Sequence, residues 1–260
     1  MAYKLKKKRA HSTNYYSTSK RSKANIRFAV VHYTANDGDT DEANAEYFTR
    51  PNIKASAHYF IDDNSITESV PVEYTAYSVG GSRQDSGSKY SKNGAKYYGK
   101  CINANSISFE LCDTQKNKKN NLSKKTRENA VDFIARKMIE LKIPSSNLIR
   151  HFDVTGKLCP LYFITDEDDW KKFKKEVVNK IKELNKPVIP MVTLKVGDEG
   201  KDVENLQNIL NTILKINLVV DGNFGVATGK AVQTFKKKYK IDSTSTTYGS
   251  KCQNKLKELL

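Results

Sequence analysis

The stretch RHFDVTGKLCP, residues 150–160, places a histidine, a lysine and a cysteine together in a chain that holds only four histidines and four cysteines. Imidazole nitrogen and thiolate sulfur are ligands that zinc prefers, and a catalytic zinc takes three protein ligands and leaves one position for water. The spacing between His151 and Cys159 allows a loop to present both side chains to one ion. The alternative is a packed histidine beside a buried, unreactive thiol.

A third ligand must come from Asp153, two positions after His151, or from another part of the chain. His32 is a candidate because it ends IRFAVVHYT (26–34), a β-branched and aromatic run that predicts a buried strand. A histidine at a strand end is more often a hydrogen-bonded polar residue than a ligand. Spacing alone therefore leaves the set of ligands open.

Two further strands are predicted to set polar side chains opposite an apolar face. In SAHYFID (56–62) and SISFELC (106–112), odd-numbered apolar positions alternate with the even-numbered ones. Burial of the odd-numbered side chains would point Glu110 to the opposite side of the sheet. On spacing alone, Glu110 is an ordinary strand carboxylate on a solvated face.

Two helices with apolar stripes are predicted to support these strands. One begins near Ser123, which can cap it, and Pro144 closes that segment. The apolar residues at helical spacing are Ala130, Ile134, Met138 and Leu141 in this helix, and Trp170, Phe173, Val177, Ile181 and Leu184 in the next. Strands and helices mixed in this order predict an α/β or α+β first domain. Of these we prefer α/β, with a mixed sheet flanked by helices, on the family resemblance described below.

A proline-bearing seam, NKPVIPMV (185–192), divides the chain. We expect a first domain over residues 1–185, a linker over 186–192 and a second, small domain over 193–260. In the second domain the helical faces are Val203, Leu206, Leu210 and Ile213, then Ala231, Val232 and Phe235 after the turn DGNFG, with Thr228 as the predicted cap of the later helix.

The net charge and the apolar content of the chain limit the classes of partner that we expect. A formal net charge of +16 predicts attraction to polyanions. The sequence has no zinc-finger spacing or RNA-binding motif, so a nucleic-acid partner is not expected, and anionic cell-wall polymers are an alternative. The apolar runs fall far short of the ~20 residues that a membrane span needs. No apolar segment follows the basic N-terminus, so we expect no membrane anchor and synthesis in the cytoplasm without a signal peptide.

The glycine- and serine-rich stretch at residues 80–100 is long for a loop within a compact domain. Such loops are usually functional or mobile, so we predict that it forms one wall of a substrate cleft.

Four segments in this order, VVHYT, SAHYFID, SISFEL and RHFDVTGKLCP, resemble the type 2 N-acetylmuramoyl-L-alanine amidases, which include phage endolysins, bacterial autolysins and peptidoglycan recognition proteins. The resemblance covers about residues 24–165. It implies zinc bound by His32, His151 and Cys159, although some relatives have Asp as the third ligand. It also implies cleavage of the amide between N-acetylmuramic acid and the L-alanine of the stem peptide.

The same resemblance assigns roles around the ion. Glu110 matches a family glutamate and is the candidate general base, while Lys157 matches a lysine that steadies the oxyanion. Asp153 would orient one of the metal ligands without binding the ion itself. His58 stands where phage relatives carry a functional tyrosine, so its role as substrate contact, proton shuttle or packed core histidine stays open.

Residues 193–260 resemble the peptidoglycan-binding domain 1 family, a three-helix module, through GDEGKDVENLQ and VDGNFG. The second turn of that family is reduced here to STSTTYGSK. Asp221, Gly222 and Phe224 are candidate wall-binding residues, although a tight turn and a core aromatic explain them as well.

Taken together, these features favour a zinc amidase of bacterial peptidoglycan built like a phage endolysin, which would need a holin or lysis to reach the wall. A bacterial autolysin or sporulation amidase would look similar. A non-catalytic peptidoglycan receptor is disfavoured because such receptors typically lose the third ligand.

Overall fold

The computed structural model describes residues 3–84, 93–117, 120–241 and 244–260. The chain forms two compact units, Met1–Leu184 and Asn185–Leu260, each with its own apolar core. The middle of the glycine-rich loop predicted as a cleft wall, residues 85–92, lies outside the described residues. Within the described part of the chain, no helix has the length and apolar character needed to cross a bilayer.

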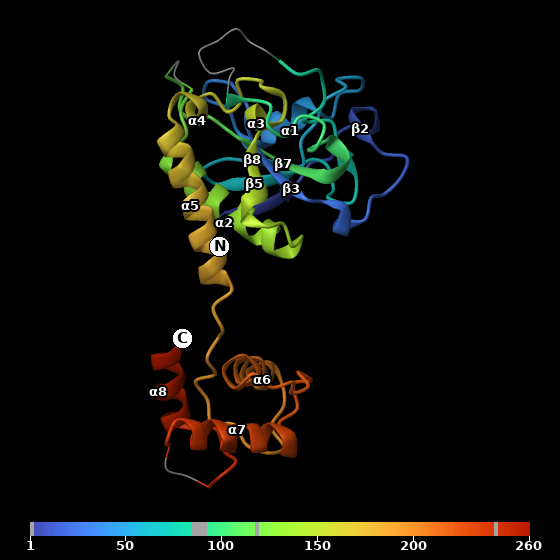
Figure 1. The fold of residues 1–260 in the computed structure, drawn as a ribbon. Coiled ribbons are helices and arrows are strands. Elements are labelled where there is room, and N and C mark those ends of the chain that lie inside the picture. Colours follow the sequence, from blue (N-terminus) through green and yellow to red (C-terminus); the bar gives the residue numbers. More distant parts are fainter. Residues whose placement is uncertain (1–2, 85–92, 118–119, 242–243) are drawn as a thin grey trace. The chain divides into compact units, whose positions relative to one another are not determined.

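A six-stranded mixed sheet in the order β1-β5-β4-β7-β3-β8 forms the centre of the first unit (Figure 1). Its strands are β1 (Lys4–Lys7), β3 (Phe28–Tyr33), β4 (Tyr59–Ile61), β5 (Ser65–Glu68), β7 (Ser106–Leu111) and β8 (Leu148–Arg150). Strands β4, β7, β3 and β8 run parallel, whereas β5 pairs antiparallel with β4. Four carboxyl-terminal strand ends therefore meet at one edge, where parallel sheets commonly bind ligands.

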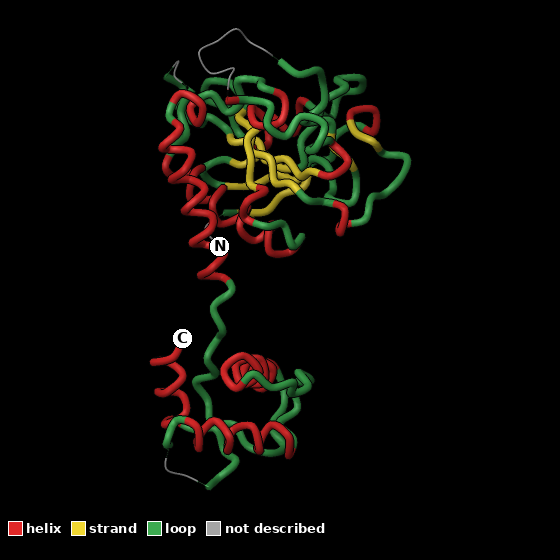
Figure 2. Tube along the Cα trace, in the orientation of Figure 1, coloured by secondary structure: helices red, strands yellow, loops and turns green. Residues whose placement is uncertain are grey.

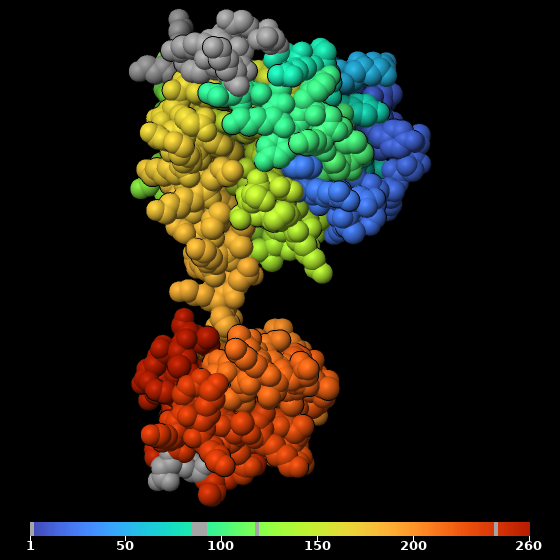
Figure 3. Space-filling view, viewed as in Figure 1, coloured from blue at the N-terminus to red at the C-terminus, as the bar shows by residue number. Residues whose placement is uncertain are grey.

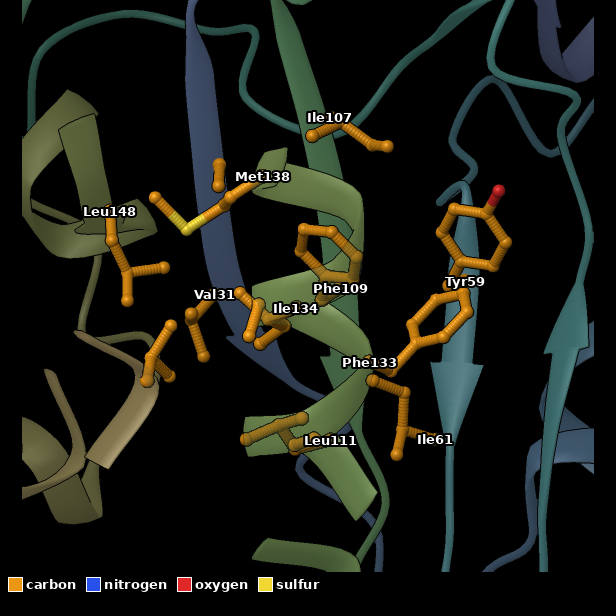
Figure 4. Close-up of a cluster of buried hydrophobic side chains, with 14 of the residues drawn as sticks. Val31, Tyr59, Ile61, Ile107, Phe109, Leu111, Phe133, Ile134, Met138 and Leu148 are labelled. Atoms are coloured by element: carbon orange, nitrogen blue, oxygen red, sulfur yellow. The ribbon is translucent and has the colours of Figure 1, made fainter. Parts of the chain in front are cut away.

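Helices α2 (Lys124–Glu140) and α5 (Glu167–Leu184) supply the core on one face of this sheet. Odd-numbered side chains of β4 and β7 point into that core, as the alternation predicts, and Phe133 and Ile134 of α2 pack on them (Figure 4). The predicted cap is confirmed, because the backbone N–H of Thr126 donates to Ser123 Oγ at 3.0 Å. The apolar stripes predicted for both helices are buried or partly buried here.

The opposite face of the sheet is also covered, which the alternating pattern does not reveal. Ser106 and Ser108 of β7 are fully buried there, although they are polar. This face lies under the short helices α1 (Asp41–Tyr47) and α3 (His151–Thr155) (Figure 2) and under Val79 and Cys101. The short helix α4 (Tyr162–Thr165) instead packs against α5 and adds Phe163 to the core on the other face. The predicted strand at 56–62 is shorter than expected: Ala57 precedes β4 and packs with Phe60 rather than with Tyr59.

Among the described residues of this unit, the remaining short elements are the pair β2 (Tyr15–Tyr16) and β6 (Thr75–Ala76), which form a two-stranded sheet, and four 3-10 turns. These turns are η1 (Ser12–Asn14), η2 (Lys23–Asn25), η4 (Asn103–Asn105) and η5 (Ser145–Asn147). The basic N-terminal segment is thus part of the fold, because β1 pairs with β5 along the sheet edge.

The described residues of the second unit, orange to red in Figure 3, form three helices, α6 (Lys201–Leu214), α7 (Val226–Lys238) and α8 (Ser250–Leu259). The apolar faces predicted for α6 and α7 pack around Tyr248 and Leu256 in one core. The predicted cap of α7 is wrong: the helix begins at Val226 with Gly225 as its cap. Thr228 lies buried inside the first turn, where its Oγ1 accepts a hydrogen bond from Gln207.

Candidate metal centre

The register of two parallel strands sets His32 beside Glu110. Strand β3 pairs with β7 so that His32 lies directly opposite Glu110, close to the carboxyl end of both strands. Both side chains point away from the α2 core, since they are on the even-numbered face. His32 Nδ1 and Glu110 Oε1 are 3.8 Å apart.

His151 and Cys159 reach the same point from the neighbouring strand. β8 pairs with β3 on its other side, and α3 begins at His151 immediately after β8. The chain then turns back, because the backbone N–H of Phe152 donates to the carbonyl of Cys159 at 2.9 Å. Cys159 Sγ lies 3.8 Å from His32 Nδ1, and the two histidine rings are 4.7 Å apart.

Gly156 makes this turn possible. It ends α3 with a φ of +86°, a left-handed conformation that L side chains rarely adopt. A Cβ atom at this position would lie 2.3 Å from the carbonyl oxygen of Gln84, whose own N–H donates to Thr155.

Arg150 fixes the start of α3 through hydrogen bonds. Its guanidinium and backbone N–H both donate to Asp153, and it also donates to the carbonyl of Phe163 and to Glu167. Arg150 and Asp153 are both buried. Asp153 is therefore occupied as an ion-pair and capping partner and does not join the cluster of potential ligands.

The geometry fits a metal ion. The ligand atoms of His32, His151 and Cys159 lie within 4.8 Å of one another, and all three residues are buried. His32 Nε2 and His151 Nδ1 have no hydrogen-bond partner among the described residues. Two nitrogens and a sulfur in this spacing are a donor set that zinc takes, with donors of one tetrahedral ion roughly 3.5 Å apart.

The protonation of these side chains agrees with ligand character. Burial holds the pKa of His32 well below its usual value, and repulsion from His151, when that ring is protonated, and from Lys157 adds to this shift. Burial and then Lys157 lower the pKa of His151 to about 4, so both imidazoles are neutral at pH 7. Burial raises the pKa of the Cys159 thiol, and a bound cation would reverse this shift.

Glu110 and Lys157 line a pocket of about 240 Å³ together with the three potential ligands, and we call this the metal pocket. Burial raises the pKa of Glu110 to about 8; Lys157 opposes that shift and Asp39 adds to it. Glu110 Oε2 is buried without a partner among the described residues, while Lys157 is exposed. The structure thus brings together five of the residues singled out from the sequence.

His58 lies outside the metal pocket. Its Nδ1 is 2.9 Å from Ser108 Oγ, and its Nε2 is 2.7 Å from Nη2 of Arg21 and 3.2 Å from the carbonyl oxygen of Tyr74. The ring is fully buried, and both nitrogens are engaged. Of the three roles left open, this geometry supports the packed, hydrogen-bonded histidine.

Sequence reasoning missed three hydroxyl groups near the metal centre. Thr34 and Ser78 line the metal pocket. Burial raises the pKa of Tyr162, and the nearby Cys159 and Glu110 raise it further. All three hydroxyls are buried and lack a partner within the described residues. Of these three residues, only Thr34 could have been identified from the sequence, because it directly follows the strand that ends near His32.

The three wall-binding candidates of the second unit each have a structural role in this geometry, but Asp221 is also exposed, so wall binding by this residue stays a prediction. Phe224 is 1% exposed in the core, so it cannot contact a large ligand. Gly222 has a φ of +73°, which the turn requires. Asp221 accepts hydrogen bonds from Gln207 and from the backbone of Asn223.

Comparison with known proteins agrees with these two units. Residues 22–161, more than half of the chain, match the family model of N-acetylmuramoyl-L-alanine amidases, and residues 199–258 match that of a peptidoglycan binding domain. The chain is 26% identical to the N-acetylmuramoyl-L-alanine amidase CwlL of Bacillus licheniformis, over 90% of this chain and 74% of that protein. The amidase BlyA of Bacillus subtilis is also 26% identical, over 60% of this chain and 42% of that protein.

Among solved structures, PlyL superposes with a TM-score of 0.51 at 27% identity, covering 67% of this chain and 96% of that one.

The buried ion pair generates a stability prediction. Replacement Arg150→Met leaves Asp153 buried without its partner, so we expect the free energy of unfolding of the first unit to fall by about 3–5 kcal/mol. Trp170, the only tryptophan, lies in this unit, so the midpoint of its fluorescence change in urea reports on this unit. The control Lys171→Met breaks an exposed pair with Asp168 and should leave the midpoint unchanged. Equal midpoints for the two variants would contradict the assigned role.

Proposed function

The chain belongs to the N-acetylmuramoyl-L-alanine amidase family, and we propose that its metal centre cleaves the amide between the lactyl group of N-acetylmuramic acid and the L-alanine of peptidoglycan. It is a hydrolase of bacterial cell-wall material. The observation that carries the proposal is the convergence of His32, His151 and Cys159 beside the buried carboxyl of Glu110.

We propose that the three ligands hold zinc, which when bound would supply a Lewis acid that polarises the scissile carbonyl and acidifies water. Glu110 acts as the general base and then as the general acid. Its buried carboxyl can take a proton near neutral pH and pass it to the departing amine, because burial raises its pKa to about 8. Metal-pocket residues around it limit the water that competes for this proton.

Lys157 stabilises the negative charge that develops on the carbonyl oxygen. It is exposed at the mouth of the metal pocket, and its charge already acts on His32, His151 and Glu110. A fixed cation at this position serves as an oxyanion-hole donor would. His58 takes no part in proton transfer in this proposal, because both of its nitrogens are engaged away from the pocket.

We further propose that residues 1–185 form the catalytic domain and that residues 193–260 hold the enzyme on the wall. The match of residues 199–258 to a peptidoglycan binding domain supports the second role. The biological setting that we favour is a phage endolysin, synthesised in the host cytoplasm and released by a holin. A bacterial autolysin or sporulation amidase is the alternative with the same chemistry.

Removal of the metal should abolish activity. We expect one zinc per chain by elemental analysis, loss of hydrolysis on chelation and recovery on addition of zinc, because the deprotonated ligands bind the ion directly. His151→Ala should lose both zinc and activity. The control His11→Ala changes a histidine of the N-terminal segment and should keep both. Full hydrolysis by metal-free protein would refute the metal-dependent mechanism.

Replacement Glu110→Gln keeps the shape of the side chain but removes the base. We expect roughly a 10²–10⁴-fold loss in rate with zinc and stability retained. The assay measures new α-amino groups in digested wall, which report amide cleavage, alongside reducing ends, which report glycosidase activity. Glu128→Gln, on the exposed face of α2, serves as the control. A zinc-loaded, fully active Glu110→Gln enzyme would exclude this residue as the base.

Loss of the second unit should affect adsorption more than chemistry. A chain of residues 1–188 should sediment poorly with insoluble wall yet turn over a soluble muramyl peptide at the full-length rate, because tethering raises the local concentration of cleavable bonds. Residual adsorption from the basic charge should fade at moderate salt, where screening acts over ~8–10 Å. Equal sedimentation of both chains at that salt would remove the anchoring role.

A further inference from the structure

A second pocket, of about 720 Å³, adjoins the metal pocket, and Tyr77 lines both. We call it the anion pocket. Its walls come mostly from residues 16–21, 75–81 and 98–104, three segments that are distant in the sequence. Among the described residues that line it, the charged ones are Lys20 and Arg21 and none is acidic. The pocket therefore presents positive charge beside the proposed reaction centre.

Arg21 is held in the wall of this pocket without a carboxylate partner. Its guanidinium donates to the carbonyls of Val72 (3.0 Å), Asn103 (3.0 Å), Ala104 (3.2 Å) and Ser106 (2.7 Å). Within the described residues no acidic side chain comes within ion-pair distance of it. Arg21 is half-buried, and its charge is not neutralised by these carbonyls, so it is available to an anion that enters the pocket.

His58 completes the support of Arg21 without adding charge. Nη2 of Arg21 lies 2.7 Å from His58 Nε2, and burial, with Arg21 adding to it, keeps the pKa of His58 well below its usual value. Burial also lowers the pKa of Arg21 to about 10. A guanidinium has five N–H donors in a planar fork. The contacts to carbonyl groups engage Nε and Nη1, so Nη2, which has no carbonyl partner among the described residues, keeps a donor for a bound anion.

We propose that the anion pocket binds a carboxylate of the stem peptide through Arg21. This inference rests on the proposed function, because the scissile amide joins two chemically different parts. The lactyl carboxyl of the sugar is consumed in the amide, whereas the peptide keeps free carboxylates. Of the two parts, only the peptide therefore supplies the anion that Arg21 lacks.

A third pocket adjoins the metal pocket through Thr34, Asn44 and Phe48. It is lined by both Asp39 and Arg50, so it does not present charge of a single sign. Asp39 Oδ1 is buried there without a partner among the described residues, and a donor such as a sugar hydroxyl would satisfy it. The anion pocket is therefore the better candidate for a carboxylate.

The test uses the product peptide, which the enzyme cannot cleave, and the full-length protein. Calorimetry compares L-alanyl-γ-D-glutamyl-L-lysine with both carboxylates free and the same peptide with both as carboxamides. We expect the free acid to bind roughly 10- to 100-fold more tightly, as for a hydrogen bond to a charged group. Because the ligand is altered rather than Arg21, the comparison does not depend on whether an Arg21 variant folds.

A matched pair of variants locates the effect. Ser19 is exposed and lines the anion pocket, so Ser19→Asp should abolish the preference for the free acid. Ser22→Asp adds the same charge three positions away, outside the lining, where Asp can replace the serine as cap of η2. It should keep the preference. Equal binding of the two peptides, or a preference that survives Ser19→Asp, would overturn the proposal.

Two further measurements identify the source of the anion and distinguish failure of the anion pocket from failure of the proposed function. Competition by inorganic phosphate at the same concentration as the free acid would overturn the assignment to a peptide carboxylate. If wall digestion releases α-amino groups but the peptides bind equally, the amidase function stands and the anion pocket fails. If the preference is present without amide cleavage, the pocket stands and the proposed reaction fails.

Discussion

The parallel register between β3 and β7 is the constraint on which the site depends. It places His32 opposite Glu110 on one face of the sheet while Val31 and Phe109 enter the core on the other. A slip of one residue would exchange the faces, placing both polar side chains among apolar groups and moving Val31 and Phe109 to the covered face that carries the polar site. The packing of α2 and α5 therefore also fixes the geometry of the metal centre, although neither helix lines the metal pocket.

The site combines polar groups that a folded chain would not bury without a purpose. Two imidazole nitrogens, a carboxylate oxygen and several hydroxyls lack partners among the described residues. Each buried and unpaired polar atom costs about 1–3 kcal/mol, so their concentration at one strand edge stores free energy that a bound ion and substrate can return. Stability elsewhere compensates, for example in the ion-paired cluster of Arg150, Asp153 and Glu167, which adjoins the potential ligand His151 in the chain.

Much of the fold followed from local pattern, because strand alternation and helical stripes depend on neighbours in the sequence. The Ser123 cap and the core faces of α2, α5 and α6 were predictable in this way. The burial of the even-numbered face was not, since it depends on loops from remote segments. The cap of α7 was misplaced because Thr228 satisfies its hydroxyl through Gln207, a tertiary contact. Spacing alone could not select Cys159 over Asp153, whereas the Arg150 ion pair now explains why Asp153 is unavailable.

Gly156 carries a consequence for how this sequence can vary. It bears no side chain and performs no chemistry, yet its left-handed φ and the carbonyl of Gln84 leave no room for a Cβ atom. Every other amino acid would have to displace that carbonyl or the end of α3, and with it the return of the chain to Cys159. We therefore expect substitutions at this position to be tolerated as poorly as substitutions of a ligand. A mutational scan would group it with the metal-binding residues, although the reason for its intolerance is purely steric.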